Sequence, residues 1–221
     1  MALNKLKFNS LNVTPTAGKT VGFNSDADGL EATLSGGSMV FIKKLTASSS
    51  GTLSFVDGSS DVVLDNTYKE YLFLFTHIHP ATDGSYLTFN YSVDSGSNYN
   101  VTKTSTAFRP FHYENDSTPE LAYNTSSDLA QSTDFQRLCD NQGNANNEAM
   151  SGTLTLFNPS STTFVKHWIS NVNMSHDADY PASVNWFTAG YGNTTSAVNA
   201  IQFKMNTGNI DAGTITLYGI N

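Results

Sequence analysis

The chain has 221 residues, of which 38% are hydrophobic and only 14% are charged, and its formal net charge is −8. A chain of this length is expected to form one domain with a sizeable core. The acidic balance, with Lys43 and Lys44 as the only adjacent basic pair, argues against binding of nucleic acid or of an anionic membrane surface.

Asn, Ser, Thr and Gly carry most of the polarity, and aromatic residues make up 12% of the chain. Aromatic and β-branched side chains suit the half-buried surface of a sheet, whereas surface helices normally display Lys, Glu and Arg. Disordered chains are poor in aromatic residues. The composition therefore predicts an ordered, all-β protein.

Residues 1–38 contain five glycines and few large apolar residues. This segment has no apolar run typical of a signal peptide. We expect an extended N-terminal arm that serves attachment or assembly, followed by one domain over residues 39–221.

Strand patterns dominate from residue 39 onwards. Apolar or alternating runs bounded by turn signals predict about ten strands. They cover residues 39–45, 51–56, 68–78, 85–93, 98–108, 151–157, 162–169, 183–188, 197–205 and 212–218. So many short strands predict an antiparallel two-sheet sandwich of the jelly-roll type.

Residues 109–148 interrupt this rhythm with Pro, Asn, Ser and Asp, and we expect a long irregular excursion with a short helix over 127–138. The predicted core of the sandwich is Phe41, Leu45, Phe55, Leu72, Leu74, Phe89, Tyr91, Leu154, Leu156, Val165, Ile169, Ile201, Phe203, Ile215 and Leu217.

The C-terminal quarter, with residues 200–203 and 209–219, resembles the closing hairpin of jelly-roll structural proteins of marine tailed bacteriophages. Residues 66–73, His79-Pro80 and residues 92–99 resemble the middle of the same group, so the resemblance covers roughly residues 39–221. In the closing motif, Gly213 permits a bulge or a close approach of another backbone.

The resemblance implies a non-enzymatic virion component, made in the host cytoplasm, that decorates the capsid or belongs to a tail or fibre. It implies no catalytic residue, metal or cofactor. The expected partners are further copies of the chain, with a trimer as the first hypothesis, and other virion proteins. Two alternatives remain open: a carbohydrate- or receptor-binding module that contacts a host-surface glycan, and a cupin-like metalloenzyme.

His77 and His79 are the sharpest metal candidate, because alternation places both imidazoles on one face of a strand. Cupins complete such a pair with a downstream Glu and a later His. Here Asp83 follows on a turn, no Glu is near, and His167 could supply a third nitrogen. The alternative is that both are ordinary polar residues at a strand end.

Two acidic segments also resemble parts of known sites. Asp26 and Asp28 mimic the start of a calcium loop, but the twelfth position holds Ser35 in place of the bidentate Glu. His176, Asp177 and Asp179 precede Pro181 and would need a cleft to act in acid–base chemistry. We expect an ordinary polar turn in the first segment and a solvated loop in the second.

Aromatic residues in or beside loops could hold a sugar or anchor a protein interface, or else fill the sandwich edge. They are Tyr113, Tyr180, Trp186, Phe187 and Tyr191. The single cysteine, Cys139, cannot form an internal disulfide, and we expect an inert thiol.

Overall fold

The computed structural model describes residues 19–23, 30–34, 38–177 and 181–221. Within these ranges it contains strands and turns but no helix, and hence no helix that could cross a membrane. The chain divides into two units, residues 1–38 and 39–221. The strands are β1 Lys19–Phe23, β2 Leu30–Leu34, β3 Met39–Thr46, β4 Leu53–Val56, β5 Glu70–Pro80, β6 Leu87–Ser92, β7 Lys103–Tyr113, β8 Pro119–Tyr123, β9 Gln136–Arg137, β10 Met150–Phe157, β11 Lys166–Ser175, β12 Ala182–Gly192, β13 Ala200–Met205 and β14 Ile210–Ile220.

The first unit contains one antiparallel strand pair. β1 and β2 run in register from Lys19 opposite Leu34 to Phe23 opposite Leu30. The sequence predicted an extended arm here, and the described part of that arm is a hairpin-like pair. The rest of residues 1–38 lies outside the described residues.

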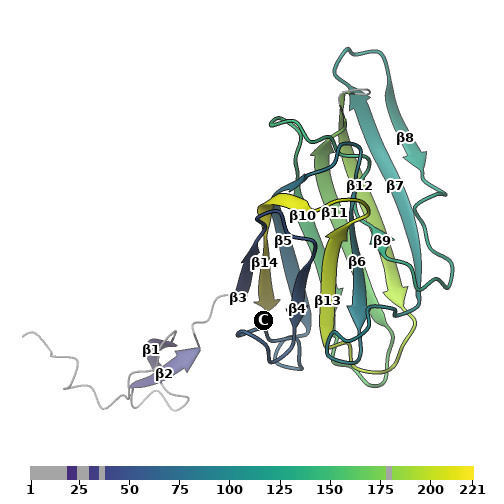
Figure 1. Cartoon of the computed structure of the whole chain (residues 1–221). Coiled ribbons are helices and arrows are strands. Elements are labelled where there is room, and N and C mark those ends of the chain that lie inside the picture. The colour runs from purple at the N-terminus through teal and green to yellow at the C-terminus, as the bar shows by residue number, and fades with distance from the viewer. Residues whose placement is uncertain (1–18, 24–29, 35–37, 178–180) are drawn as a thin grey trace, which may run out of the picture. The chain divides into compact units, whose positions relative to one another are not determined.

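The second unit is a sandwich of two antiparallel sheets (Figure 1). The larger sheet has eight strands in the order β3-β14-β5-β10-β11-β12-β7-β8, and the smaller has four in the order β4-β13-β6-β9. The predicted all-β, two-sheet architecture is therefore confirmed. Because the larger sheet has twice as many strands, the β7–β8 end of it extends beyond the smaller sheet (Figure 1).

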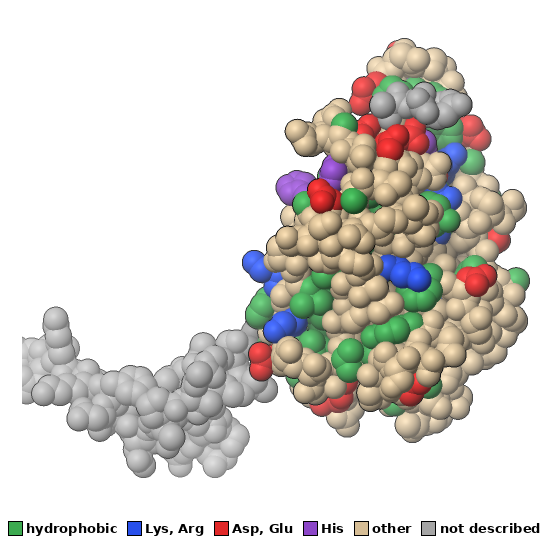
Figure 2. Space-filling model, in the orientation of Figure 1, with side chains coloured by type: hydrophobic (Ala, Val, Ile, Leu, Met, Phe, Trp, Pro, Cys, Tyr) green, Lys and Arg blue, Asp and Glu red, His purple; other side chains and the backbone are tan. Residues whose placement is uncertain are grey.

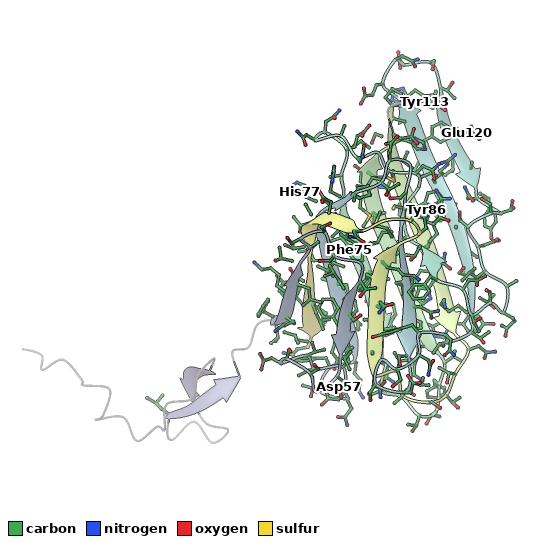
Figure 3. All side chains as sticks on the ribbon, viewed as in Figure 1. Asp57, Phe75, His77, Tyr86, Tyr113 and Glu120 are labelled. Carbon is green, nitrogen blue, oxygen red and sulfur yellow. The ribbon has the colours of Figure 1, made fainter. Side chains whose placement is uncertain are left out.

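Aromatic rings fill the space between the sheets. Phe203 of β13 lies within 5.4 Å of the rings of both Phe73 and Phe75, measured between centroids. Phe89 of β6 meets Trp168 of β11 edge to face. Figure 3 labels Phe75 in this interior. Such tilted and edge-on contacts add to the free energy gained by burying each ring.

Most of the predicted core is buried, but four of its members point away from the core: Phe41, Leu72, Leu74 and Ile169. Phe55, Phe89, Tyr91, Leu154, Leu156, Ile201, Phe203, Ile215 and Leu217 are buried as expected. Phe41 is 60% exposed and Ile169 is 54% exposed. Leu45, Leu72, Leu74 and Val165 are half-buried.

Ile169 of β11 was predicted to be in the core, and the length of the strand explains why it is not. The strand runs six residues beyond its predicted end, and these added residues decide which face turns inward. Val172 and Met174 share the parity of Trp168, so burying this set brings three large apolar side chains inside. Ile169, on the opposite parity, therefore points out.

The excursion at residues 109–148 is more ordered than the sequence predicted. It contains the end of β7, all of β8 and the short β9. The helix expected over residues 127–138 is wrong, because backbone groups there bond to β7 instead of to each other. The amide of Ser132 donates to the carbonyl of Lys103, and the amide of Leu129 donates to the hydroxyl of Ser105.

Candidate functional site

His77 and His79 lie beside a break in the regular pairing of β5. His77 has a positive φ of 49°, and the register of β5 against β14 shifts on both sides of Ala212. Gly213, with φ of 105°, meets this bulge, because a Cβ there would lie 2.4 Å from the His77 carbonyl oxygen. The predicted role of Gly213 in a close backbone approach is thus confirmed.

Both imidazoles line one surface pocket of about 430 Å³ together with Asp211. Figure 2 shows histidine side chains next to an acidic one on this flank of the molecule, and Figure 3 labels His77 there. The ring of His79 is already engaged. Its Nε2 lies 3.1 Å from the carbonyl oxygen of Ala145, and its Nδ1 lies 3.9 Å from an Asp211 carboxylate oxygen.

His167 does not complete a metal site with this pair. His167 on β11 lies opposite the Phe157 end of β10, whereas the His77 amide donates a hydrogen bond to Ser151 at the other end of β10. Six residues of β10, or roughly 20 Å, separate these two positions. Within the described ranges, no three side chains of His, Cys, Asp or Glu are grouped closely enough to hold a metal ion.

The structure describes only some of the other candidate residues. Asp26, Asp28, Asp179 and Tyr180 lie outside the described residues. His176 and Asp177 are described, and the His176 Nδ1 atom lies 3.1 Å from an Asp177 carboxylate oxygen.

His176 lies beside a charged cluster that the sequence did not predict. The buried carboxylate of Asp140 pairs with Arg109 and accepts a 2.5 Å hydrogen bond from Arg137. His176 Nε2 stands 3.9 Å from the same carboxylate. The Arg137 guanidinium also donates to the carbonyl of Cys139 at 2.7 Å, so the chain after β9 is tied to it.

Aromatic rings complete the surroundings of the two guanidinium groups. Arg137 lies over Tyr86 at 4.1 Å and over Trp186 at 5.1 Å from the ring centroids. Burial lowers the pKa of both Arg109 and Arg137, but a guanidinium remains charged at any physiological pH. Beside the cluster is a cavity of about 290 Å³. The arrangement anchors the excursion to the end of the larger sheet.

Trp186 is not a surface residue. It is fully buried on β12, so of the two interpretations the one in which this ring fills the sandwich is correct for Trp186, and a sugar-binding surface is not. Its side chain points to the same face of β12 as Val184 and Thr188, which are also buried. This face is covered because β12 is an interior strand of the larger sheet. Tyr113, Phe187 and Tyr191 are half-buried.

Cys139 is fully buried, and its sulfur accepts a hydrogen bond from the Leu87 amide at 3.2 Å. Burial raises the pKa of the thiol to about 11, which disfavours the reactive thiolate at neutral pH.

A further feature of the described residues is an apolar surface on the larger sheet. We call it the outer sheet face: the surface of the eight-stranded sheet that is turned away from the smaller sheet. It carries large apolar side chains near both of its edges and at its centre. They are Met39, Phe41 and Tyr218 near β3, Phe157, Ile169 and Tyr191 at the centre, and Phe108, Phe187, Leu121 and Tyr123 on β7, β12 and β8.

Large apolar side chains are exposed or line a pocket in two parts of the outer sheet face. At the β7–β8 edge, the rings of Phe108 and Phe187 stack 4.8 Å apart and nearly parallel, and Leu121 beside them is 70% exposed. At the centre, Ile169 and Tyr191 line an apolar surface pocket of about 400 Å³. Large exposed apolar patches on a folded domain mark places where proteins meet.

Comparison of the chain with protein-family models, curated proteins and solved structures finds no match.

Proposed function

We propose that this chain is a non-enzymatic structural protein of a tailed-bacteriophage virion, a capsid-decoration, tail or fibre subunit held by protein–protein contacts. The observation that carries the proposal is the outer sheet face, where Phe41, Ile169 and Leu121 are each more than half exposed. Packing such side chains against another subunit removes apolar area from water, at about 25 cal/mol for each Å². The resemblance of residues 39–221 to phage structural proteins supplies the virion setting.

The strand order supports a jelly-roll assignment within this proposal. Eight of the strands match a jelly roll when they are taken in chain order as β3, β4, β5, β6, β9, β10, β13 and β14. Each strand of this series lies in the opposite sheet from the one before it, except β9, which follows β6 in the smaller sheet. One sheet holds the first, eighth, third and sixth, and the other holds the second, seventh, fourth and fifth. This is the order of double-sheet jelly rolls, which are common in viral capsid proteins. The pairs β7–β8 and β11–β12 are then insertions that widen one sheet.

The partner in this proposal is first another copy of the chain, with a trimer as the working hypothesis, and then other virion proteins. Light scattering coupled to size-exclusion chromatography tests it. The double variant Ile169→Lys/Leu121→Lys should lower the oligomeric state, because two charges would be buried at the contact. The double variant Ser59→Lys/Ser117→Lys adds the same charge at exposed positions and should not. A monomeric wild-type chain at high concentration would contradict self-association.

The virion assignment has its own test. Mass spectrometry of purified particles from the source virus, with immunogold labelling, should find the chain at a fixed surface position. Absence of the chain from particles would refute the assignment.

We also propose that residues 1–38 act as the attachment or assembly element. An isolated two-stranded pair such as β1–β2 is only marginally stable in water, so it gains order from a neighbour. A truncation that starts at Gly37 should keep the β-sheet spectrum and lose oligomerisation or particle binding. Unfolding of the truncated chain would show instead that the segment belongs to the core.

A further inference from the structure

Lys103 is a completely buried lysine that connects the two sheets. It lies on β7 of the eight-stranded sheet, and its side chain reaches Asn90 on β6 of the four-stranded sheet. Its Nζ atom lies 2.6 Å from Oδ1 of Asn90 and 2.9 Å from the carbonyl oxygen of Val101. Asn90 is also fully buried. An amine and a carboxamide are therefore held in contact and away from water.

The carboxamide of Asn90 is polarised by its surroundings. Its oxygen accepts a second hydrogen bond, from the backbone amide of Tyr91 at 2.7 Å. Its nitrogen donates to the carbonyl of Thr133 at 2.8 Å. The Tyr91 N–H draws electron density from the carboxamide carbon, and this fixed donor is suited to hold negative charge that develops on that oxygen during attack by the amine.

The amine of Lys103 is suited to act as a nucleophile. Burial lowers its pKa to about 7, against a smaller opposing effect from the charge of Asp134. Much of the amine is then neutral at physiological pH, and only the neutral form has the lone pair needed for attack.

We propose that Lys103 and Asn90 form an isopeptide bond in the folded chain. The neutral Nζ attacks Cγ of Asn90, and the Tyr91 amide holds the oxygen of the tetrahedral intermediate. A proton passes from Nζ to Nδ2, the Cγ–Nδ2 bond breaks, and ammonia leaves. The product is a secondary amide, so the reaction needs no oxidant, reductant or further reactant.

The bond would join the two sheets covalently between positions thirteen residues apart in the chain. This inference goes beyond the proposed structural role and does not depend on it. The chain also offers a matched control in Lys166, which is equally buried. The Lys166 amine donates to main-chain carbonyls, those of Phe164 at 2.7 Å and Thr194 at 3.2 Å, and has no carboxamide side chain among these partners.

Intact-mass spectrometry of the full recombinant chain under denaturing conditions tests the proposal. The expected mass is about 17 Da below that of the sequence, the mass of one ammonia. Trypsin should fail to cut after Lys103. Cleavage before Asp94 by an aspartate-directed protease should give a branched peptide that carries both Asn90 and Lys103.

Lys103→Arg should restore the full mass, and Lys166→Arg should retain the deficit. A full-mass wild type that is cut after Lys103, even after prolonged incubation above neutral pH, would overturn the proposal. So would a deficit that maps to a succinimide in a linear peptide, or one that persists in Lys103→Arg. If a variant fails to fold, the wild-type mass and its branched peptide still decide the question.

Discussion

Phe89 of the smaller sheet and Trp168 of the larger sheet meet edge to face, with their ring centroids 4.9 Å apart and their planes at 81°. Both side chains are fully buried. Since the two residues belong to different sheets, their contact is part of what holds the sandwich closed.

Trp168→Ala should lower the free energy of unfolding by about 4 kcal/mol, because it removes a large buried ring and leaves a cavity. Asn171→Ala, three positions along the same strand, is the control. Asn171 is exposed and does not belong to the apolar side chains of the outer sheet face, so its truncation should change stability by less than about 0.5 kcal/mol. Urea denaturation followed by fluorescence or circular dichroism measures both. Equal losses would mean that the parity of β11 is not as described.

In β11 and β5 the sequence does not determine which set of alternating side chains faces the core. Strands such as β10 and β13 were predicted with correct inward faces, because most of the large apolar side chains of each strand share one parity. In β5 both parities are apolar, with Tyr71 and Phe73 against Leu72 and Leu74, so alternation cannot decide between them. The aromatic set turns inward, where it fills the space between the sheets.

Gly213→Ala should lower the free energy of unfolding by more than about 2 kcal/mol. The backbone there has a positive φ of 105°, and the added Cβ would lie 2.4 Å from the His77 carbonyl oxygen, which cannot move without breaking the β5–β14 pairing. Gly58→Ala is the matched control, because Gly58 also has a positive φ but open space around it.

Gly58→Ala should cost about 1 kcal/mol, from backbone strain alone. Thermal or urea unfolding of the two variants therefore separates the cost of strain from that of the clash. A smaller loss for Gly213→Ala than for Gly58→Ala would argue against the close approach at His77.

Asp140→Asn should lower the free energy of unfolding by about 3 kcal/mol. The substitution preserves the shape of the side chain but leaves the guanidinium groups of Arg109 and Arg137 without their buried counter-charge. Asp116→Asn, which alters the exposed pair with His112, should have no measurable effect. Comparable stability of Asp140→Asn and the wild type would mean that solvent compensates the two arginines.

The sequence could not have identified the cluster around Asp140. Arg137 and Asp140 are three residues apart, but Arg109 on β7 and His176 just after β11 are distant in the sequence, and only the fold brings them to Asp140. The same is true of Lys103 and Asn90. A lysine at the start of a strand is normally a surface residue, and only the packing of the two sheets buries it.

Cys139 should react with a thiol reagent such as DTNB only as fast as the chain unfolds. Its sulfur is fully buried, and its pKa of about 11 leaves almost no thiolate near pH 8.

The raised pKa of Cys139 also makes the stability of the protein depend on pH. Between about pH 9 and pH 11 the unfolded thiol loses its proton while the folded one keeps it, so the free energy of unfolding should fall as pH rises through this range.

Other groups, including Tyr71 and Tyr91, titrate at high pH, so the effect of Cys139 is measured as a difference from Cys139→Ala. From pH 8.5 to pH 11 the wild type should lose about 2 kcal/mol more than the variant, as the shift of the thiol pKa implies. Urea denaturation at fixed pH values measures this difference. Parallel pH profiles of the two proteins, or rapid labelling of the native thiol, would show that Cys139 is open to solvent.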